Sequence, residues 1–207
     1  MEMNEQQLIT MTERVDDIPL LLAQMRKIHL SELINAHFPV HGNWKGLSMG
    51  EVLSGWLSYI LSRGDHRLNH VESWAKSLPV TLGEGLSQEV RALDFSDDRL
   101  ALVLNSLGND DKWEALERSL NTCILRVYDL KAERIRLDTT TAKSYVEVTE
   151  EGLFQFGHSK DHRSDLPQLK ISQSALDPLG MPVTTTVLSG NCADDQQFPL
   201  NKNNHTI

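Results

Sequence analysis

The 207-residue sequence has few of the features that would place it in a secreted, membrane or metal-rich class. It holds only two cysteines, Cys123 and Cys192, which lie far apart and match neither a metal-binding nor a redox spacing. No run of about 18 apolar residues occurs, so we expect no transmembrane helix and no membrane partner. The acidic start, residues 1–17, lacks the basic end and apolar core of a signal peptide. We therefore expect reduced thiols and a cytoplasmic location.

Positive charge is also in short supply. The chain has 20 basic and 29 acidic side chains, a formal net charge of −9. Residues 1–130 hold 12 basic and 19 acidic side chains, a net of −7, and residues 131–207 hold 8 and 10, a net of −2. Because DNA binding relies on lysine and arginine to neutralise phosphates, the total argues against a strong non-specific grip on nucleic acid. The second part is closer to neutral and could present a local basic face.

Periodic apolar residues predict a helical domain over residues 18–130, after a polar tail at 1–17. The clearest helix begins with Ser48 and Glu51, which match a capping box, and ends at Gly64. Residues 79–95 look irregular, and the turn at 106–110 suggests a helix-turn-helix only weakly because the next helix starts acidic. The expected helices are 18–38, 47–64, 68–77, 96–108 and 110–130.

From residue 133 onward, within a second region that starts at 131, the pattern is that of strands. The stretch 134–146 is one strand candidate, with Ile135 and Leu137 at its inward positions. The segment 168–190 reads as a β-hairpin, because two alternating stretches flank the turn sequence DPLG at 177–180. A long polar connection, 147–165, separates these strands, and such connections often carry function. From the residues alone we therefore expect a helical domain followed by a region of β-strands.

Asp138 raises a chemical question, since it follows the apolar strand positions and precedes three threonines, which predicts a carboxylate at the end of an apolar strand face. A buried carboxylate is costly unless a cation or metal ion pairs with it. One hypothesis is a ligand for a hard divalent cation such as Mg²⁺. The other is a carboxylate at a solvent-facing strand end, which needs no partner.

The segment 157–165 gathers four potential metal ligands: His158, Asp161, His162 and Asp165. The two histidines would suit zinc if the segment were helical, but Gly157 and two serines argue against a helix. A phosphate-facing patch built with Lys160, Arg163 and Lys170 fits the composition better. A plain solvated loop is the remaining interpretation.

Three motifs together resemble one family. They are IRLDTTTAKSYV at 135–146, the stretch from Gly157 to Asp165, and Gly190-Asn191 followed by Asp194. In this order and spacing they closely resemble the DDE transposases of bacterial insertion sequences, nearest to the insertion-sequence-4 superfamily. The segment SDDRL at 96–100 also looks like part of the helical N-terminal region of that family.

The resemblance implies an RNase H-like catalytic domain at 131–207 behind the helical domain, which makes the fold α+β. Asp138 would be the first of three carboxylates that hold two Mg²⁺ (or Mn²⁺) ions, and thus both a catalytic residue and a metal ligand. Such enzymes cut transposon ends and join them to target DNA. The implied partner is DNA, at the terminal inverted repeats, in the bacterial cytoplasm and nucleoid. The DNA contacts assigned on this basis are Lys143, His158, Lys160, His162 and Arg163.

The sequence departs from the family in one respect. The second Asp and the Glu of the family follow later strands and a helix, whereas this sequence stops at Ile207. Asp194 and Asp195 lie where the family has a loop, so neither is promoted to the second position. We expect a C-terminally truncated transposase with the first three strands of an incomplete RNase H-like domain. A single carboxylate does not hold two divalent ions against their hydration shells, so we expect no catalysis.

Two other hypotheses remain open. The chain could be a non-catalytic DNA-binding protein, or a dominant-negative partner that pairs with full-length transposase. Its first strand would lie at an open sheet edge, which favours self-association. The chain could instead be an unrelated metal hydrolase that uses Asp138 with the 158–165 loop.

Overall fold

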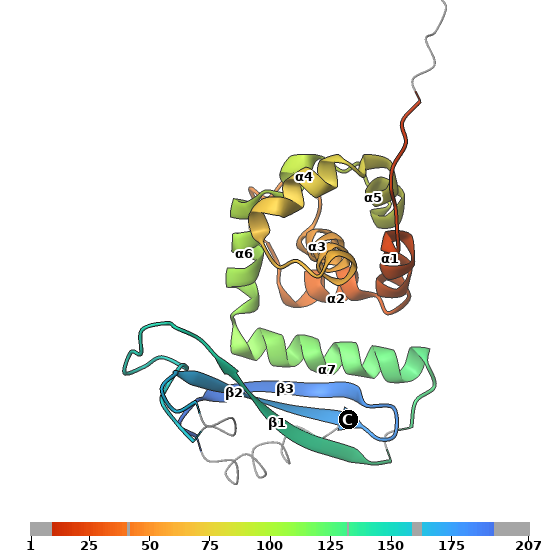
Figure 1. The fold of residues 1–207 in the computed structure, drawn as a ribbon. Coiled ribbons are helices and arrows are strands. Elements are labelled where there is room, and N and C mark those ends of the chain that lie inside the picture. Colours follow the sequence, from red (N-terminus) through yellow and green to blue (C-terminus); the bar gives the residue numbers. More distant parts are fainter. Residues whose placement is uncertain (1–9, 41, 132, 159–162, 193–207) are drawn as a thin grey trace, which may run out of the picture. The chain divides into compact units, whose positions relative to one another are not determined.

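The structure is a computed structural model that describes residues 10–40, 42–131, 133–158 and 163–192. Within these residues the fold is α+β, with seven α-helices followed by a three-stranded antiparallel sheet (Figure 1). This order confirms the α+β class expected from the sequence, with helices first and strands second. The chain divides into two compact units, Met1–Cys123 and Ile124–Ile207, which we call the helical unit and the sheet unit.

The helices that the structure describes have the following bounds. They are α1 (Ile18–Lys27), α2 (Leu30–His37), α3 (Met49–Arg63), α4 (Val71–Lys76), α5 (Pro79–Leu86), α6 (Asp97–Leu107) and α7 (Asp110–Val127), with short 3₁₀ helices η1 (Leu68–His70) and η2 (Ala92–Phe95). None of these helices combines the length and the apolar character that a lipid bilayer requires of a spanning segment.

Helix α3 runs through the middle of the helical unit, with α1, α2, α4, α5 and α6 around it (Figure 1). It begins where the sequence predicts. The Ser48 hydroxyl accepts a hydrogen bond from the Glu51 amide at 3.3 Å, and the Glu51 carboxylate accepts one from the Ser48 amide at 2.7 Å. It ends at Gly64, whose φ of 61° is the left-handed conformation that glycine adopts at low cost. The capping box and the helix end are both confirmed.

The core of the helical unit consists of apolar side chains that extend along the chain from Ile18 to Leu116. Phe95 is fully buried in it and meets the Trp74 ring edge-on, with 6.4 Å between ring centroids. A Cβ atom at Gly55 would lie against the Phe95 ring, so the absence of a side chain there makes room for it. Burial of this kind is the main stabilising contribution to a small helical domain.

Two expectations about the helices are wrong. Residues 18–38 form two helices, because His29 adopts a left-handed conformation with φ of 54° and separates α1 from α2. The break lets Met25 and Leu30 both reach the core. The stretch 79–95 is not irregular but contains α5 and η2.

Helix α5 forms despite its two glycines because its surroundings fix it. Pro79 occupies the first turn, where a missing amide hydrogen costs nothing. The Glu13 carboxylate accepts hydrogen bonds from the amides of Val80 and Thr81, both at 2.8 Å, and from the Thr81 hydroxyl. Burial raises the pKa of Glu13, but these three donors outweigh it and hold the pKa below its usual value. The segment before α1 is therefore tied to the domain.

An ion cluster around the buried Asp94 carboxylate links η2 and α6 to the loop before α3. Asp94 is fully buried and accepts hydrogen bonds from the guanidinium groups of Arg91, at 2.8 Å, and Arg99, at 3.0 Å. Arg99 also donates to the Leu47 carbonyl at 2.6 Å and lies 4.2 Å from the centroid of the Trp44 ring. The SDDRL segment thus contributes a structural cation that fastens the loop before α3.

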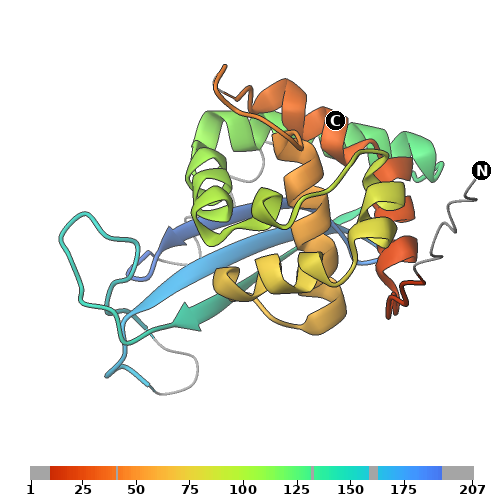
Figure 2. The same ribbon diagram turned by 90° about the horizontal axis from the view of Figure 1, so that it is seen from above.

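The sheet unit contains β1 (Ile135–Lys143), β2 (Gln168–Leu176) and β3 (Met181–Ser189). The strands are antiparallel in the order β1-β2-β3, with β2 in the middle (Figure 2). The hairpin across 168–190 is confirmed, with its turn at the predicted residues 177–180. Among the described residues β1 pairs with β2 alone, so it is an edge strand, as expected.

The two faces of the sheet follow from the register. Thr139 lies opposite Ser172 and Thr141 opposite Lys170, so these side chains share one face. On β2 this polar face is the buried one: Gln168, Lys170, Ser172 and Ser174 are all buried, whereas Leu169 and Ile171 are partly exposed. Hydrogen bonds compensate for several of these buried polar atoms, although Gln168 Oε1 has no partner among the described residues. The Lys170 ammonium donates to the Cys192 carbonyl at 2.5 Å, and the Ser174 and Thr184 hydroxyls lie 2.5 Å apart.

Candidate functional site

Asp138 is the fourth residue of β1 and does not end the strand, which continues to Lys143. The expectation of a strand-terminal carboxylate is therefore wrong. The three threonines extend the strand because their β-branched side chains favour extended backbone. The Asp138 side chain is exposed, and its Oδ1 accepts a hydrogen bond from the Thr139 amide at 2.8 Å.

The neighbours of Asp138 are polar. Gln173 lies directly across on β2, and Arg136 and Thr140 share its face of β1. The Arg136 guanidinium is already paired, at 2.7 Å, with the Asp177 carboxylate at the hairpin turn. Since an exposed carboxylate is solvated by water, Asp138 needs no partner charge to be stable here. Its oxygens form a hard donor group that a divalent cation could approach from solvent.

No metal-ligand cluster is present among the residues that the structure describes. Groups of three or more His, Cys, Asp or Glu side chains close enough to share an ion do not occur there. Of the proposed loop cluster, Asp161 and His162 lie outside the described residues. The metal-hydrolase hypothesis therefore stays a prediction.

The residues assigned to DNA contact gather in part. Lys160 and His162 lie outside the described residues, and His158 is exposed in the loop that leads toward them. Arg163 forms a two-point ion pair with Asp165, at 2.8 and 2.9 Å, and its side chain also bonds to Tyr145. These contacts hold the pKa of Arg163 above its usual value and the pKa of Asp165 below it, and the charge of Lys143 lowers the Asp165 value further.

Lys143 and Arg163 therefore lie near one acidic group, at the end of the sheet where β1 stops and β2 begins. Asp138 is not part of this group. It precedes Lys143 by five residues, which corresponds to roughly 17 Å along a strand, and an odd spacing puts the two side chains on opposite faces. The predicted site residues thus form two separate places on the sheet unit.

Sequence reasoning missed the group that fixes the loop at this end of the sheet. Gln168 is fully buried, and its Nε2 donates to the carbonyls of His158, at 2.9 Å, and Gly190, at 3.2 Å. Its backbone also exchanges two hydrogen bonds with Gln155, at 2.9 and 3.0 Å. A Cβ atom at Gly190 would overlap the Gln168 carbonyl oxygen, and one at Gly157 would overlap the Gly190 carbonyl oxygen.

The two motif glycines are therefore required by close backbone packing. They were visible in the sequence as fixed points of the family resemblance, but their partner Gln168 was not. The clamp formed by Gln155, Gln168 and Gly190 holds the exposed His158 segment at a set position on the sheet unit.

Comparison with known proteins identifies the helical unit. Residues 10–118 match the family described as "Domain of unknown function (DUF4277)". This match covers more than half of the chain, so the chain belongs to that family. Neither a curated protein nor a solved structure gives a significant match.

Proposed function

We propose that this member of the DUF4277 family derives from a DDE transposase of the insertion-sequence-4 superfamily. In this proposal the sheet unit corresponds to the first three strands of an RNase H-like catalytic domain. The observation that supports it is the meander β1-β2-β3, whose first strand carries an exposed Asp138 while the later motifs follow in family order. The resemblance requires an aspartate on the first strand, and β1 has one.

The donor set around Asp138 does not fit a two-metal centre by itself. Among the described residues the donor set consists of the Asp138 carboxylate itself, the Thr140 hydroxyl and the Gln173 amide. Two divalent ions need several converging carboxylates, so we assign no catalytic step to this chain alone. In the proposed ancestry, Asp138 is the first carboxylate of a centre that further carboxylates complete.

The test combines DNA binding and DNA cleavage. We expect the chain to shift a duplex that carries insertion-sequence terminal repeats more than a scrambled duplex of equal length. We also expect no nicking of supercoiled plasmid with Mg²⁺ or Mn²⁺. The matched control is Glu147→Ala, which removes an exposed acid outside the strands, beside Asp138→Ala. Metal-dependent nicking that Asp138→Ala alone abolishes would disprove the inactivity, and equal binding to both duplexes would count against the transposase proposal.

A second function is favoured by the edge position of β1. An edge strand can accept a further strand from another chain. The chain could therefore pair with full-length transposase and inhibit it. In a strand-transfer assay with a full-length relative, inhibition should rise with the amount of added chain, and an unchanged rate at excess chain would contradict this function.

A further inference from the structure

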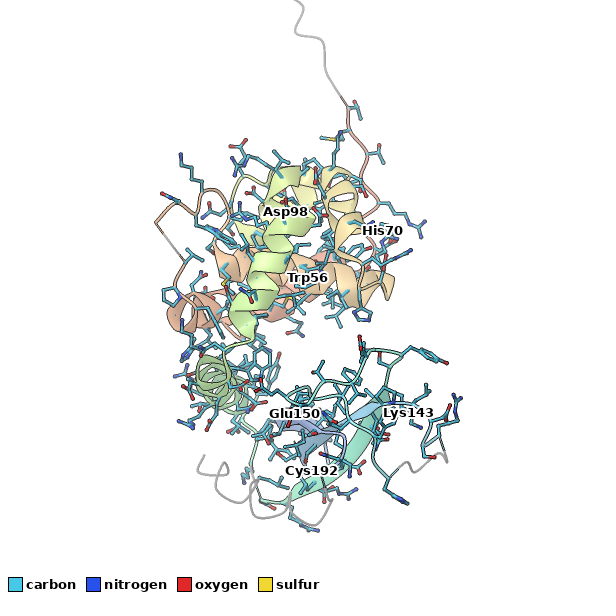
Figure 3. All side chains as sticks on the ribbon, turned by 90° about the vertical axis from the view of Figure 1, so that its left-hand side faces the viewer. Trp56, His70, Asp98, Lys143, Glu150 and Cys192 are labelled. Carbon is cyan, nitrogen blue, oxygen red and sulfur yellow. The ribbon has the colours of Figure 1, made fainter. Side chains whose placement is uncertain are left out.

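The helical unit contains an open pocket that none of the family motifs covers. Its volume is about 680 Å³. It lies where α3 ends and η1 and α4 follow, and Figure 3 shows His70 at the periphery of the unit. Its wall includes Tyr59, Arg63, Asp65, Arg67, His70 and Trp74.

Asp65 organises the polar part of this wall. Its carboxylate accepts hydrogen bonds from the Tyr59 hydroxyl at 2.6 Å, from Nε of Arg67 at 2.9 Å and from Nη2 of Arg67 at 3.1 Å. Nδ1 of His70 lies 3.1 Å from the same carboxylate. These partners, Arg67 first among them, keep the pKa of Asp65 well below its usual range. Burial and the Asp65 carboxylate raise the pKa of Tyr59 to about 12, so Tyr59 remains a donor.

The Asp65 carboxylate holds the Arg67 guanidinium in one orientation but engages only some of its N–H groups. A guanidinium has five N–H groups, and Asp65 engages only Nε and Nη2. The Arg67 side chain is 69% exposed, so its other donors face solvent. Arg63 stands on the same wall, and its closest acid is Asp16 at 3.5 Å, longer than a good charge-assisted hydrogen bond.

One residue of the wall has a buried donor without an acceptor. Trp74 is buried, and among the described residues its indole Nε1 has no hydrogen-bond partner. The wall thus carries Arg63 and Arg67 beside a single wall carboxylate, Asp65, whose oxygens already accept several hydrogen bonds, while Asp16 reaches Arg63 from outside the wall. Residues 1–130 as a whole are acidic, with a net charge of −7. Guanidinium N–H groups that face solvent beside an already engaged carboxylate suit an anionic partner.

We infer that this pocket binds a phosphate group of the DNA backbone, with the Arg67 and Arg63 guanidinium groups as the phosphate donors. Planar guanidinium groups match the paired oxygens of a phosphodiester, and an arginine fixed by a neighbouring carboxylate loses little further freedom on binding. The inference rests on the proposed DNA-related function and assigns part of that function to the DUF4277 domain itself. Sequence-independent phosphate contacts of this kind position a protein on DNA without reading bases.

The experiment measures binding of the full chain to a fluorescein-labelled, random-sequence duplex of about 30 base pairs, by fluorescence anisotropy from about 50 to 300 mM NaCl. Loss of one phosphate contact lowers the slope of log K against log salt by about one. We expect Arg67→Ala and Arg63→Ala each to weaken binding and to lower the slope by this amount. Arg67→Lys keeps the positive charge but loses the paired N–H donors of the guanidinium, so it should weaken binding less than Arg67→Ala.

The matched control is Arg118→Ala, which removes the same charge from an exposed residue of α7 that is not part of the pocket wall. Its slope should stay at the wild-type value. If Arg67→Ala and Arg118→Ala behave alike while wild type binds DNA, the pocket inference is overturned and the proposed function stands. If wild type binds no duplex at all, both fail. Binding of inorganic phosphate with no effect of the variants on DNA affinity assigns the pocket to free phosphate and also overturns the inference.

Discussion

In the helical unit the buried side chains are mainly apolar, whereas the buried side chains of the sheet unit are mainly polar. The apolar core lies wholly within Ile18–Leu116. Among the described residues after 123, the buried apolar side chains are Leu176 and Val183, and the buried polar ones are Gln168, Lys170, Ser172, Ser174 and Thr184. One unit is stabilised by excluding water, and the other depends on hydrogen bonds between buried polar groups, among which Gln168 Oε1 has no partner in the described residues.

The difference teaches where each unit is vulnerable. Apolar burial is non-directional, so the helical unit loses stability in proportion to the volume removed from its core. A buried polar group is costly when its partner is lost but nearly neutral when both partners are replaced. The sheet unit should therefore respond to the pairing of groups more than to their size.

The largest effect is expected in the apolar core. Phe95→Ala removes a fully buried ring and should lower the free energy of unfolding by about 3–5 kcal/mol. Urea denaturation followed by circular dichroism at the helical band measures it. Leu93→Ala is the matched control, because it lies in the same 3₁₀ helix but is 69% exposed, and it should change stability by less than about 0.5 kcal/mol. Equal effects would mean that the core does not stabilise the unit.

The next effect concerns Asp94, a buried charged residue of the otherwise mainly apolar interior of the helical unit. Asp94→Asn leaves Arg99 without its counter-charge and should cost about 3 kcal/mol at neutral pH, measured by the same denaturation. A loss below about 1 kcal/mol would show that Asp94 is only weakly coupled to its two arginines.

Asp94 also predicts a dependence on pH. Burial raises its pKa, but the Arg91 hydrogen bonds and the charges of Arg91 and Arg99 outweigh burial and hold the pKa below its usual value. A carboxyl with a lowered folded-state pKa contributes stability above its unfolded pKa of about 4 and loses that contribution as pH falls through the folded value. Wild type should therefore lose stability on acidification below about pH 4 more steeply than Asp94→Asn. Parallel curves for the two proteins would contradict this assignment.

A smaller effect is expected at the close backbone contact of the sheet unit. Gly190→Ala places a Cβ against the Gln168 carbonyl and should cost about 1–3 kcal/mol, seen as faster amide exchange across β2. Gly42→Ala is the control, because a Cβ there meets no atom within 4 Å. Unchanged amide exchange in Gly190→Ala would show that the backbone at Gly190 can move away from Gln168 without loss of stability, which contradicts the prediction.

The smallest effect tests the pairing rule directly. Ser174→Ala leaves the buried Thr184 hydroxyl without its 2.5 Å partner and should cost about 1 kcal/mol. The double variant Ser174→Ala/Thr184→Val removes both hydroxyl groups and should recover most of this loss. Additive losses in the double variant would mean that the sheet unit behaves like the helical one.

Local signals allowed much of the fold to be predicted from the sequence. The Ser48–Glu51 capping box and the DPLG turn act within a few residues, so α3 and the hairpin could be recognised without tertiary information. Helix α5 could not, because its start is completed by Glu13, far away in sequence. The buried face of β2 was hidden for the same reason, since Lys170 is satisfied by the Cys192 carbonyl beyond β3.

The candidate sites show the same division. Asp138 was found through its motif, but its position within the strand was misjudged because the sequence changes there from Leu and Ile to Thr without changing conformation. The pocket around Asp65 was missed entirely. Its polar stretch RGDHR at 63–67 reads as an ordinary helix end, and only the packing of Tyr59 and Trp74 beside it shows that these charges converge.

The contact of Glu13 with α5 has a practical consequence for where the DUF4277 domain begins. Judged by secondary structure, the domain would start with α1 at Ile18. A chain shortened to that point would leave the Val80 and Thr81 amides without their acceptor, although every helix would still be encoded. The family match instead starts at residue 10, upstream of Glu13. An expressed DUF4277 domain should therefore include Glu13, which lies in the non-helical segment before α1, and should not begin at the first helix.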